Sequence, residues 1–585
     1  MDYGSVYHRI TDNFCYALNK DDLIVNIKTG YDVKQVFLHY NDPYAYKLKK
    51  NHGKHNMFRK EFVDKKRLKH HIWWSILIKP EYKRCQYFFE IVTDAETWFY
   101  FDDGFLSRTE MVDRANSLQY FTFPWMNQAD IISVPNWVNE TIWYQVFLDR
   151  FCNGDEKLNP KEVKPWSNGE VGKFDFYGGD LVGLYNKLDY IEELGITGLY
   201  LSPLCESNSY HHYDTIDYYK VDGHLGDECL LKKLVDKAHK KGIRVMFDGV
   251  FNHSGPQFKP WLDVIKHGSK SRYYSWFMIQ EWPFQSDGLA SQNGQYYTFG
   301  FVDCMPKLNT NNQEVIDYII DVCKFWIQTY RIDGIRFDVA SEISHECFRQ
   351  LRRQLKLIQP DIFLLGEIWG DSIQWLQGDQ FDSIMNYPLI EAIHQFWFDD
   401  TKTKFDLECA INCCYVMYSK TINDVLFNLF DSHDTERLIH RAGSLDIFYQ
   451  YLVILYTMPG SPCIFYGTEI AIEGAHDPDC RRCMPWEDIS CGKYDDCMKV
   501  VKELIQLRKT REAFRSQKMY FQNTIENPRL IELVKISEDG KEKIEIYLNC
   551  SKSSVILSKT NEALFSLQFD ETIGMLQPNG VLIQK

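Results

Sequence analysis

The sequence lacks an excess of positive charge. Its 66 Lys and Arg residues are outnumbered by 81 Asp and Glu residues among 585, so the formal net charge is −15. A surface that binds nucleic acid must neutralise phosphates over a broad area, and this balance argues against such a surface. We therefore expect neutral or cationic ligands and no nucleic-acid partner.

Long apolar runs are also missing. The longest uncharged run, residues 448 to 468, is interrupted by Pro459, Gly460 and Pro462, which favours a buried strand region over a membrane span. Charged and polar residues within the first twelve positions break the apolar core that a secretory signal needs. We expect no membrane partner and no export by that route.

Cysteine is plentiful, but it lacks the even count and regular spacing of a disulfide framework. Seventeen scattered cysteines predict reduced thiols and a cytoplasmic setting. Cys480 and Cys483 form a C-x-x-C pair, yet the gaps to Cys491 and Cys497 fit no common zinc module and no histidine pair accompanies them. Zinc is therefore not expected.

Aromatic residues are what the sequence has in excess. The 15 Trp, 36 Tyr and 38 Phe residues make up 15% of the chain. Aromatic faces stack against planar or apolar ligand surfaces, and they also fill β-rich cores. Composition alone leaves both interpretations open.

The pattern along the chain predicts four parts. Residues 1–125 alternate short β-favouring runs with turn residues, which is typical of an antiparallel β-sandwich. Residues 126–253 and 310–510 repeat apolar strand, turn and amphipathic helix, which predicts an α/β fold, a (β/α)8 TIM barrel. Residues 254–309 lack this rhythm and are expected to form a subdomain inserted after strand 3. Residues 511–585 return to β-type alternation and predict a C-terminal β-sandwich.

Eight runs are candidate barrel strands: residues 143–147, 197–201, 243–247, 335–339, 362–367, 383–386, 426–430 and 463–466. One of the intervening helices is clear, because Asn312 can cap it and apolar residues recur at helical spacing from Val315 to Ile327.

Carboxylates cluster just after four of these strands. Asp248, Asp338, Glu367 and Asp434 come from different strands, and the carboxyl ends of barrel strands meet at one rim. Such pairs suit glycoside hydrolysis, whereas the alternative is a divalent-metal enzyme with the same acids as ligands. Arg336 favours the first, because it lies two residues before Asp338 on the same strand face, where it would keep that carboxylate ionised and repel a metal.

Several ordered motifs resemble one enzyme family. The segments DGVFNH (248–253), GIRFDVASE (334–342), GEIW (366–369) and FDSHD (430–434) are similar to the signature regions of the α-amylase superfamily. The segment MPKLN (305–309) resembles the extra motif of its neopullulanase, cyclomaltodextrinase and maltogenic amylase branch. The likeness extends over nearly the whole chain.

The resemblance implies a role for each of three carboxylates. Asp338 would be the nucleophile, Glu367 the general acid and base, and Asp434 the group that stabilises the distorted sugar. We expect Asp338 to be ionised beside Arg336, and Glu367 to be protonated near neutrality because Gly366 and Ile368 make its setting apolar.

Eight further residues are implied as substrate contacts. Tyr213 would stack under the reacting glucose, His253 and His433 would bind sugar hydroxyls, and Trp369 would lie on the leaving-group side. The full set is Tyr213, Asp248, His253, Arg336, Trp369, His433, Asp477 and Arg481.

The resemblance also implies a structural calcium ion. Its ligands would be Asn153, Asp155, Asn159, the Gly178 carbonyl and Asp180. The chain departs from its relatives at Leu158, where many carry another polar ligand, and at Asn159, where some have Asp.

The function expected from these residues is retaining hydrolysis of α-1,4-glucosidic bonds in cyclodextrins, pullulan and maltooligosaccharides, with side transglycosylation. A 4-α-glucanotransferase is the alternative within catalysis. A non-catalytic carbohydrate-binding protein is disfavoured because all three catalytic carboxylates are present. The branch further implies a homodimer in which the N-terminal domain helps to wall the active site.

Overall fold

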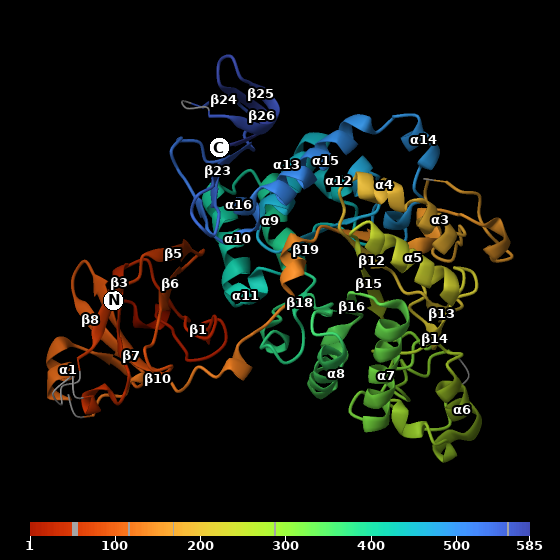
Figure 1. Cartoon of the computed structure of the whole chain (residues 1–585), viewed down its shortest axis with the longest axis horizontal. Helices are drawn as coiled ribbons and strands as arrows, with labels where there is room; N and C mark the ends of the chain where they lie inside the picture. The colour runs from red at the N-terminus through yellow and green to blue at the C-terminus, as the bar shows by residue number, and fades with distance from the viewer. Residues whose placement is uncertain (49–55, 115–116, 168, 286–287, 558–560) are drawn as a thin grey trace. The chain divides into compact units, whose positions relative to one another are not determined.

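The computed structural model describes residues 1–48, 56–114, 117–167, 169–285, 288–557 and 561–585. The chain forms two compact units. The first comprises Met1–Ser133, Glu391–Asn423 and Tyr520–Leu530, and the second comprises Val134–Ile390, Asp424–Met519 and Ile531–Lys585. Figure 1 traces the chain through both.

The first unit is built on two antiparallel sheets that share one core. Apolar residues from both sheets, among them Val25, Ile76 and Phe89, form a single buried cluster. Because alternate side chains of each strand point to this cluster, the short β-favouring runs fold as a sandwich. The predicted N-terminal β-sandwich is confirmed. The strand order of the first sheet is β1 (Cys15–Ala17), β2 (Leu23–Thr29), β6 (Ile72–Ile78), β5 (Asp64–Arg67). The strand order of the second sheet is β4 (Phe58–Glu61), β3 (Val33–Asn41), β7 (Cys85–Thr93), β8 (Thr97–Phe101), β9 (Gly104–Leu106), and β10 (Phe121–Phe123) also pairs with β7.

Three helices complete the first unit: α1 (Arg108–Asp113), α10 (Lys404–Val416) and α11 (Lys420–Asn423). Arg67 of β5 forms an ion pair with Glu408 of α10, and the Asn13 amide donates to the Val416 carbonyl at 2.6 Å. The range 310–510, predicted as barrel, thus contains a segment that packs on the sandwich. Helical periodicity shows that a face is buried but not which domain buries it.

The second unit contains the predicted barrel. Its eight parallel strands have the order β18 (Ser383–Ile384), β17 (Phe363–Gly366), β16 (Gly334–Phe337), β15 (Arg244–Gly249), β12 (Gly198–Leu201), β11 (Trp143–Val146), β20 (Ser461–Phe465), β19 (Phe427–Leu429). A parallel bridge between Met385 and Phe427 joins the two ends of this order and closes the sheet. Each strand lies within or beside its predicted run, so the (β/α)8 fold is confirmed.

Side chains fill the interior of the barrel. Trp143, Tyr200, Phe363 and Phe427 belong to one fully buried cluster that draws residues from most of the strands. The Trp143 indole N–H donates to the Ser461 hydroxyl at 2.8 Å, so its one polar atom is satisfied. The packed interior makes the rim, not the centre, available for ligands.

Helices lie outside the strands of the barrel (Figure 1). Asp227, Asn312, Ser344 and Ser444 cap α5, α7, α8 and α13 through side-chain oxygens that accept backbone N–H bonds. The predicted Asn312 cap is confirmed. The helices of this unit are α2 (Leu148–Phe151), α3 (Leu181–Asn186), α4 (Leu188–Glu193), α5 (Glu228–Lys240), α6 (Lys259–His267), α7 (Gln313–Tyr330), α8 (His345–Ile358), α12 (Leu438–Ala442), α13 (Leu445–Thr457), α14 (Trp486–Ser490), α15 (Asp495–Thr510) and α16 (Glu512–Arg515), while α9 (Tyr387–Phe398) spans both units.

The interval after β15 has little regular structure, as its lack of rhythm predicts. It contains α6 and an aromatic cluster in which Trp261 contacts Phe277, Phe284 and Tyr296 at ring separations of 4.8 to 5.5 Å. A bridge between His253 and Lys307 ties its two ends together. The insertion is therefore stabilised by its own aromatic core and by the bridge between His253 and Lys307 beside the rim.

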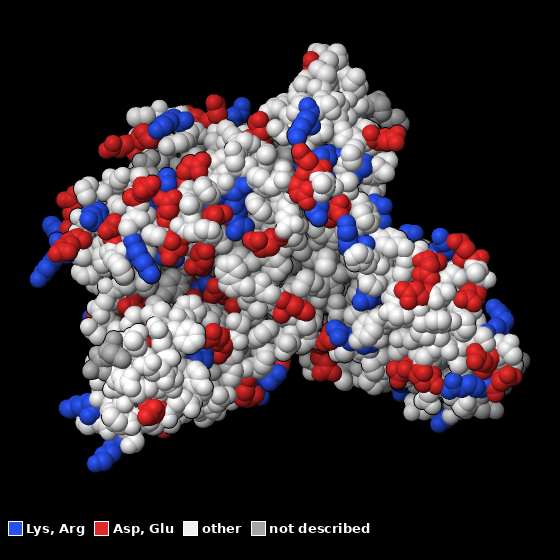
Figure 2. All heavy atoms as spheres, turned by 180° about the vertical axis from the view of Figure 1, so that it is seen from behind, with Lys and Arg blue, Asp and Glu red and all other residues white. Residues whose placement is uncertain are grey.

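The chain ends in the expected β-domain, which forms one antiparallel sheet. The order is β21 (Met519–Phe521), β22 (Leu530–Ile536), β23 (Lys543–Asn549), β26 (Met575–Gln584), β24 (Val555–Ile556), with β25 (Ala563–Asp570) on β26. Within the described residues, no helix combines the length and apolar character that crossing a membrane requires. On the face shown in Figure 2, acidic and basic side chains are interspersed.

Candidate active site

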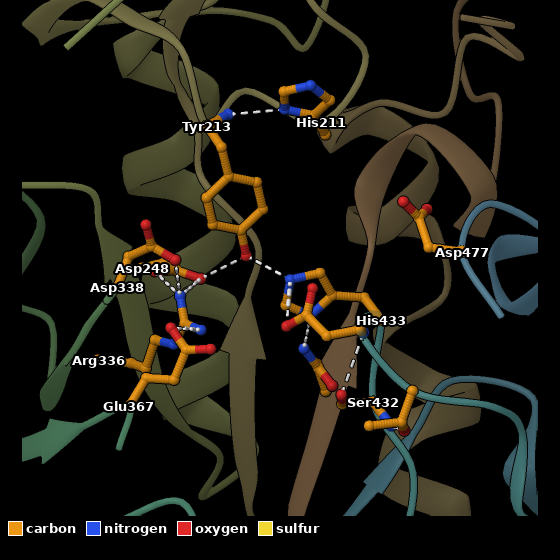
Figure 3. A network of polar contacts seen from close by, with 12 residues as sticks. His211, Tyr213, Asp248, Arg336, Asp338, Glu367, Ser432, His433 and Asp477 are labelled. Atoms are coloured by element: carbon orange, nitrogen blue, oxygen red, sulfur yellow. Dashed lines mark hydrogen bonds and ion pairs between the residues drawn. The ribbon is translucent and has the colours of Figure 1, made fainter. Parts of the chain in front are cut away.

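Four strands of the barrel deliver carboxylates to one rim. Asp248 lies in β15, Asp338 and Glu367 directly follow β16 and β17, and Asp434 follows β19. Figure 3 shows Asp248, Asp338 and Glu367 gathered around Arg336. The parallel register places the ends of β15, β16 and β17 side by side, because Asp248 pairs with Arg336 and Arg336 with Leu365.

Arg336 is the centre of the cluster. Its Nη1 lies 2.8 and 2.9 Å from the two Asp248 oxygens and 2.8 Å from Asp338 Oδ1, and its Nη2 lies 2.8 Å from Glu367 Oε2. The guanidinium is fully buried. One cation is therefore shared by three carboxylates, and the Asp338 and Glu367 groups are held close to each other.

This sharing corrects the expectation that Arg336 alone would keep Asp338 ionised. Burial raises the pKa of Asp338 well above its usual range; Arg336 opposes the shift, while Glu367, Asp248 and Asp434 add to it. Burial likewise raises the pKa of Asp434, against Arg481 and Arg336. Buried carboxylates outnumber the cations in this cluster, so desolvation and mutual repulsion raise the pKa of Asp338 and Asp434 while the two arginines oppose the rise.

The setting of Glu367 also differs from the expected apolar one. Its Oε2 accepts the Val339 backbone N–H at 2.8 Å, and its Oε1 accepts the Trp369 indole N–H at 3.0 Å. Val339 adopts a left-handed conformation with φ 45°, which is rare for a β-branched residue and ends β16 at Phe337. The strained backbone aims an N–H at Glu367 instead of continuing the strand.

Asp248 does not reach the rim surface. Its side chain is fully buried and binds Arg336, the Tyr200 hydroxyl at 2.7 Å and the Tyr213 hydroxyl at 2.9 Å. As placed, Asp248 supports Arg336 and the two tyrosines, and its predicted contact with substrate stays a prediction.

Tyr213 and His433 form the opposite wall. Tyr213 lies in the loop between β13 (Cys205–Ser207) and β14 (Thr215–Val221), and its ring stacks on His433 with centroids 5.4 Å apart and an interplanar angle of 6°. His433 Nε2 lies 2.6 Å from the Tyr213 oxygen and 3.2 Å from Asp434 Oδ2. Burial lowers the pKa of His433 well below its usual range, so the ring is neutral.

His253 lies beneath this loop. Its Nε2 lies 3.0 Å from the Tyr213 carbonyl, its ring stacks on Phe299 at 5.3 Å, and only 1% of the residue is exposed. Burial lowers its pKa to about 4. As placed, His253 supports the backbone of Tyr213, and its predicted bond to a sugar hydroxyl stays a prediction.

Asp477 and Arg481 join the network at its far side. Arg481 Nη1 lies 2.8 Å from Asp477 Oδ1, its Nη2 lies 3.6 Å from Asp434 Oδ1, and its Nε donates to the His433 carbonyl at 2.9 Å. Arg481 is buried, whereas the Asp477 side chain is 40% exposed. The arginine thus fixes an exposed carboxylate at the rim.

Trp369 is the most exposed of the predicted contacts, at 50%. Its ring stacks on Tyr387 with centroids 3.8 Å apart and an interplanar angle of 4°. The structure therefore brings all eleven predicted catalytic and substrate-contact residues into one connected network.

Sequence reasoning missed several members of this network: Gln145, Tyr200, Tyr210, His211 and Tyr387. Tyr210 and His211 could have been found, because they lie three and two residues before Tyr213 in the sequence. The others lie within apolar runs, where no local signal marks them.

The predicted calcium ligands lie together near α2, but most of their side-chain oxygens already accept hydrogen bonds from the chain itself. Asp180 accepts from Gly154, Asp155 and Gly183, and Asn159 Oδ1 accepts from the Asn153 amide at 3.0 Å. Asn153 Oδ1 is the exception, since it is buried without a hydrogen-bond partner among the described residues. That orphan acceptor and the amide and carboxylate chemistry around it fit a hard cation.

A side chain at Gly178 would collide with this group, since a Cβ there would lie 2.2 Å from Asn159 Oδ1. Leu158 contributes its carbonyl to the His224 ring at 2.9 Å and offers no polar side chain. No group of three His, Cys, Asp or Glu side chains suited to a metal occurs in the described part of the chain.

Two family models match this chain. "Alpha amylase, catalytic domain" matches residues 145–524, and "Alpha amylase, N-terminal ig-like domain" matches residues 1–127. Among similar proteins, the cyclomaltodextrinase of Geobacillus thermopakistaniensis (strain MAS1) is 40% identical over 94% of this chain and 91% of its own.

Other relatives carry related names. The intracellular maltogenic amylase of Bacillus subtilis is 36% identical over 94% of this chain and 91% of its own, and neopullulanase 2 of Thermoactinomyces vulgaris is 36% identical over 86% and 84%. A solved cyclomaltodextrinase structure matches with a TM-score of 0.88 and 34% identity, covering 100% of this chain and 98% of the other.

Proposed function

This chain belongs to the α-amylase family and is a glycosidase of α-glucans, and we propose that it cleaves α-1,4-glucosidic bonds of cyclodextrins, pullulan and maltooligosaccharides with retention of configuration. The relatives named cyclomaltodextrinase, maltogenic amylase and neopullulanase support this choice of substrates. The observation that carries the mechanism is the single guanidinium, Arg336, that holds the Asp338 and Glu367 carboxylates. Retaining enzymes need two such carboxyl groups close together.

In the proposed reaction, Asp338 attacks the anomeric carbon while Glu367 donates a proton to the departing glycosidic oxygen. A covalent glycosyl ester forms at Asp338, and the Glu367 carboxylate then takes a proton from the water that displaces it. Two inversions at one carbon restore the α-configuration. Asp434 would bind the distorted sugar ring, and Tyr213 would offer its ring face from the opposite wall.

Substitution of the two acids tests this assignment. Asp338→Asn and Glu367→Gln should each lower kcat on β-cyclodextrin by at least about 10³-fold, because each removes one chemical step. Asp317→Asn, an exposed acid of α7, is the matched control and should leave kcat unchanged. Full activity of Asp338→Asn, or a β-anomer as the first product in proton NMR, would contradict the proposal.

Product analysis separates hydrolysis from 4-α-glucanotransfer. A hydrolase raises the number of reducing ends formed from maltotriose, whereas a pure transferase conserves them; side transglycosylation would appear as longer oligosaccharides. On pullulan, panose would indicate α-1,4 cleavage, and maltotriose would indicate α-1,6 cleavage. Conserved reducing ends on every glucan would favour the transferase.

We also propose a structural calcium ion held by Asn153, Asp155, Asn159, the Gly178 carbonyl and Asp180. The buried, unpartnered Asn153 Oδ1 supports it. The ion would neutralise the carboxylates of Asp155 and Asp180 in the segment that leads from β11 to α3, and it would take part in no reaction step. Dialysis against a chelator should lower Tm, and added calcium should restore it; in Asn153→Leu both effects should vanish. An unchanged Tm in the native protein would contradict the proposal.

A homodimer and a cytoplasmic location complete the proposal. The seventeen cysteines all carry free thiols, which supports a reducing compartment, and one relative is named an intracellular maltogenic amylase. The dimer rests on the resemblance of the N-terminal domain to that of the branch. Light scattering during size exclusion would contradict it by giving the mass of one chain, 69.3 kDa.

A further inference from the structure

Gln145 is a buried amide that the proposed chemistry does not use. It lies in β11, two residues after Trp143, so both side chains point to the same face of the strand. Trp143 belongs to the interior cluster of the barrel, and Gln145 therefore points into the barrel one layer closer to the rim. Only 1% of Gln145 is exposed.

Among the described residues, the one polar partner of the Gln145 side-chain amide is a residue of the active site. Gln145 Nε2 lies 2.7 Å from His433 Nδ1. An amide nitrogen can only donate, so Nδ1 must be the acceptor and the imidazole proton must sit on Nε2. This tautomer also fits the surroundings of Nε2, because Nε2 lies 3.2 Å from Asp434 Oδ2, which can accept its hydrogen.

The reverse orientation of the amide is disfavoured. With Oε1 facing the ring, Nδ1 would carry the proton and Nε2 would present a lone pair to the Asp434 carboxylate. The two amide hydrogens would then be buried without acceptors. In the observed orientation, Oε1 and one of the two Nε2 hydrogens of Gln145 have no partner among the described residues. Both orientations thus leave two polar groups of the amide unsatisfied, and only the reverse one adds a lone-pair repulsion between His433 and Asp434.

The direction of the whole hydrogen-bond chain follows from this tautomer. His433 Nε2–H points to the Tyr213 oxygen at 2.6 Å, so the single hydroxyl proton of Tyr213 is free to go to Asp248 Oδ2 at 2.9 Å. Figure 3 shows His433, Tyr213 and Asp248 in this order along the dashed lines. Asp248 in turn holds Arg336.

We propose that Gln145 is a positioning residue that fixes the Nε2–H tautomer of His433 and thereby orients Tyr213 and Asp434 toward the sugar in the reacting subsite. Gln145 itself touches no substrate. The inference rests on the proposed function, because it assigns Tyr213, His433 and Asp434 to that subsite.

Gln145 also prevents the ring from becoming a cation. A second proton on Nδ1 would face the amide NH₂, which cannot accept it. The other charged or titratable groups around His433 are Asp434, Tyr213, Glu367, Arg336, Arg481 and His211, and Cys480 lies against its carbonyl. The two arginines disfavour the imidazolium further.

Two variants separate this role from simple packing. Gln145→Met keeps the size of the side chain and removes the donor, and we expect kcat/KM on β-cyclodextrin to fall 10- to 100-fold, mostly in kcat. Gln145→Glu supplies an acceptor for Nδ1–H, so the imidazolium becomes stable at low pH. On deprotonation Nδ1 keeps its proton and Nε2–H is lost, so activity should fall as pH rises and the optimum should shift to lower pH.

Gln450→Met is the matched control. Gln450 is an equally buried glutamine of α13, and its amide donates to the Asn549 carbonyl at 3.2 Å, away from the rim. It should lower Tm and leave the shape of the pH–rate profile unchanged.

Wild-type kcat/KM and profile shape in both Gln145 variants would overturn the inference. The same holds if their loss of activity only parallels their loss of Tm, as in the control. A wild-type protein that turns over no α-glucan would instead overturn the proposed function.

Discussion

At the scale of single residues, the site depends on hydrogen bonds that hold each acid in place. Glu367 accepts from Val339 and Trp369 and pairs with Arg336. Two hydrogen bonds and one ion pair fix the orientation of the carboxylate before substrate arrives. Such preorganisation lowers the reorganisation cost of a reaction. Trp369 is thus both an exposed aromatic face and a donor to the proposed acid.

Trp369→Phe should separate these two roles. Phenylalanine can keep the stacking on Tyr387 but cannot donate to Glu367. A hydrogen bond to a charged group contributes about 1.5 kcal/mol or more. Because its loss leaves Glu367 less firmly oriented, we expect kcat on β-cyclodextrin to fall by about 10-fold.

Trp375→Phe is the control for that experiment. The Trp375 indole N–H is buried without a hydrogen-bond partner in the described part of the structure, so removing it should leave kcat unchanged. Equal losses of kcat in both variants, or no loss in Trp369→Phe, would show that the Trp369 N–H does not position Glu367.

At the scale of elements, the ends of strands and helices decide where functional groups lie. The run predicted as a strand over 335–339 stops at Phe337, because the left-handed Val339 turns its N–H toward Glu367. Helix α7, by contrast, follows its sequence signals, with Asn312 as cap and Val315, Ile319 and Trp326 on the buried face. Local sequence signals therefore predict the ends of scaffold elements such as α7, but not the ends of strands that meet the active site.

Removal of the α7 cap should cost stability but not activity. Asn312 Oδ1 accepts the Glu314 N–H at 2.9 Å, and its amide donates to the Ser275 carbonyl at 3.1 Å. Asn312→Ala should lower the free energy of unfolding by about 1 kcal/mol, as lost caps do.

Denaturant unfolding measures this change. Asn311→Ala, at an exposed neighbouring position that does not cap the helix, serves as control. A stability loss no larger than in that control would show that the cap does not limit the stability of α7.

At the scale of the whole molecule, buried neutral histidines make stability depend on pH. In the sandwich, His8 Nδ1–H donates to the Asn26 carbonyl at 2.6 Å, and burial lowers the pKa of His8 from 6.5 to about 3. Below pH 6.5 His8 is protonated in the unfolded chain, whereas in the folded sandwich it stays neutral until the pH approaches 3. The contribution of His8 to the free energy of unfolding is therefore complete above pH 6.5 and is lost as the pH falls toward 3.

His8→Gln should reveal this dependence. The variant should be less stable than the native chain at about pH 7. The difference between their free energies of unfolding should narrow by about 2 kcal/mol on going from pH 6.5 to about 5. Thermal unfolding at several pH values checks it, with the exposed His70→Gln as control. A constant difference over this range would contradict the prediction, because it would mean that His8 takes up its proton equally in the folded and the unfolded chain.

The sequence predicts most of the scaffold, because its signals are local. Apolar runs of strand length, turn residues and helix caps act over a few positions, and they gave eight strands, the inserted subdomain and both flanking β-domains. The assignment of α10 to the sandwich unit was not predictable, since its partner Arg67 lies 341 positions away from Glu408.

The same division applies to the site. The sequence by itself determined which acids reach the rim, because each follows an apolar strand and the ends of parallel strands meet. Only the tertiary structure decided their electrostatics: one Arg336 is shared by three carboxylates, and burial raises the pKa of Asp338 against it. It also placed Gln145 beside His433, 288 positions apart. Charge and hydrogen bonding depend on distance and burial in space, and spacing along the chain does not encode either.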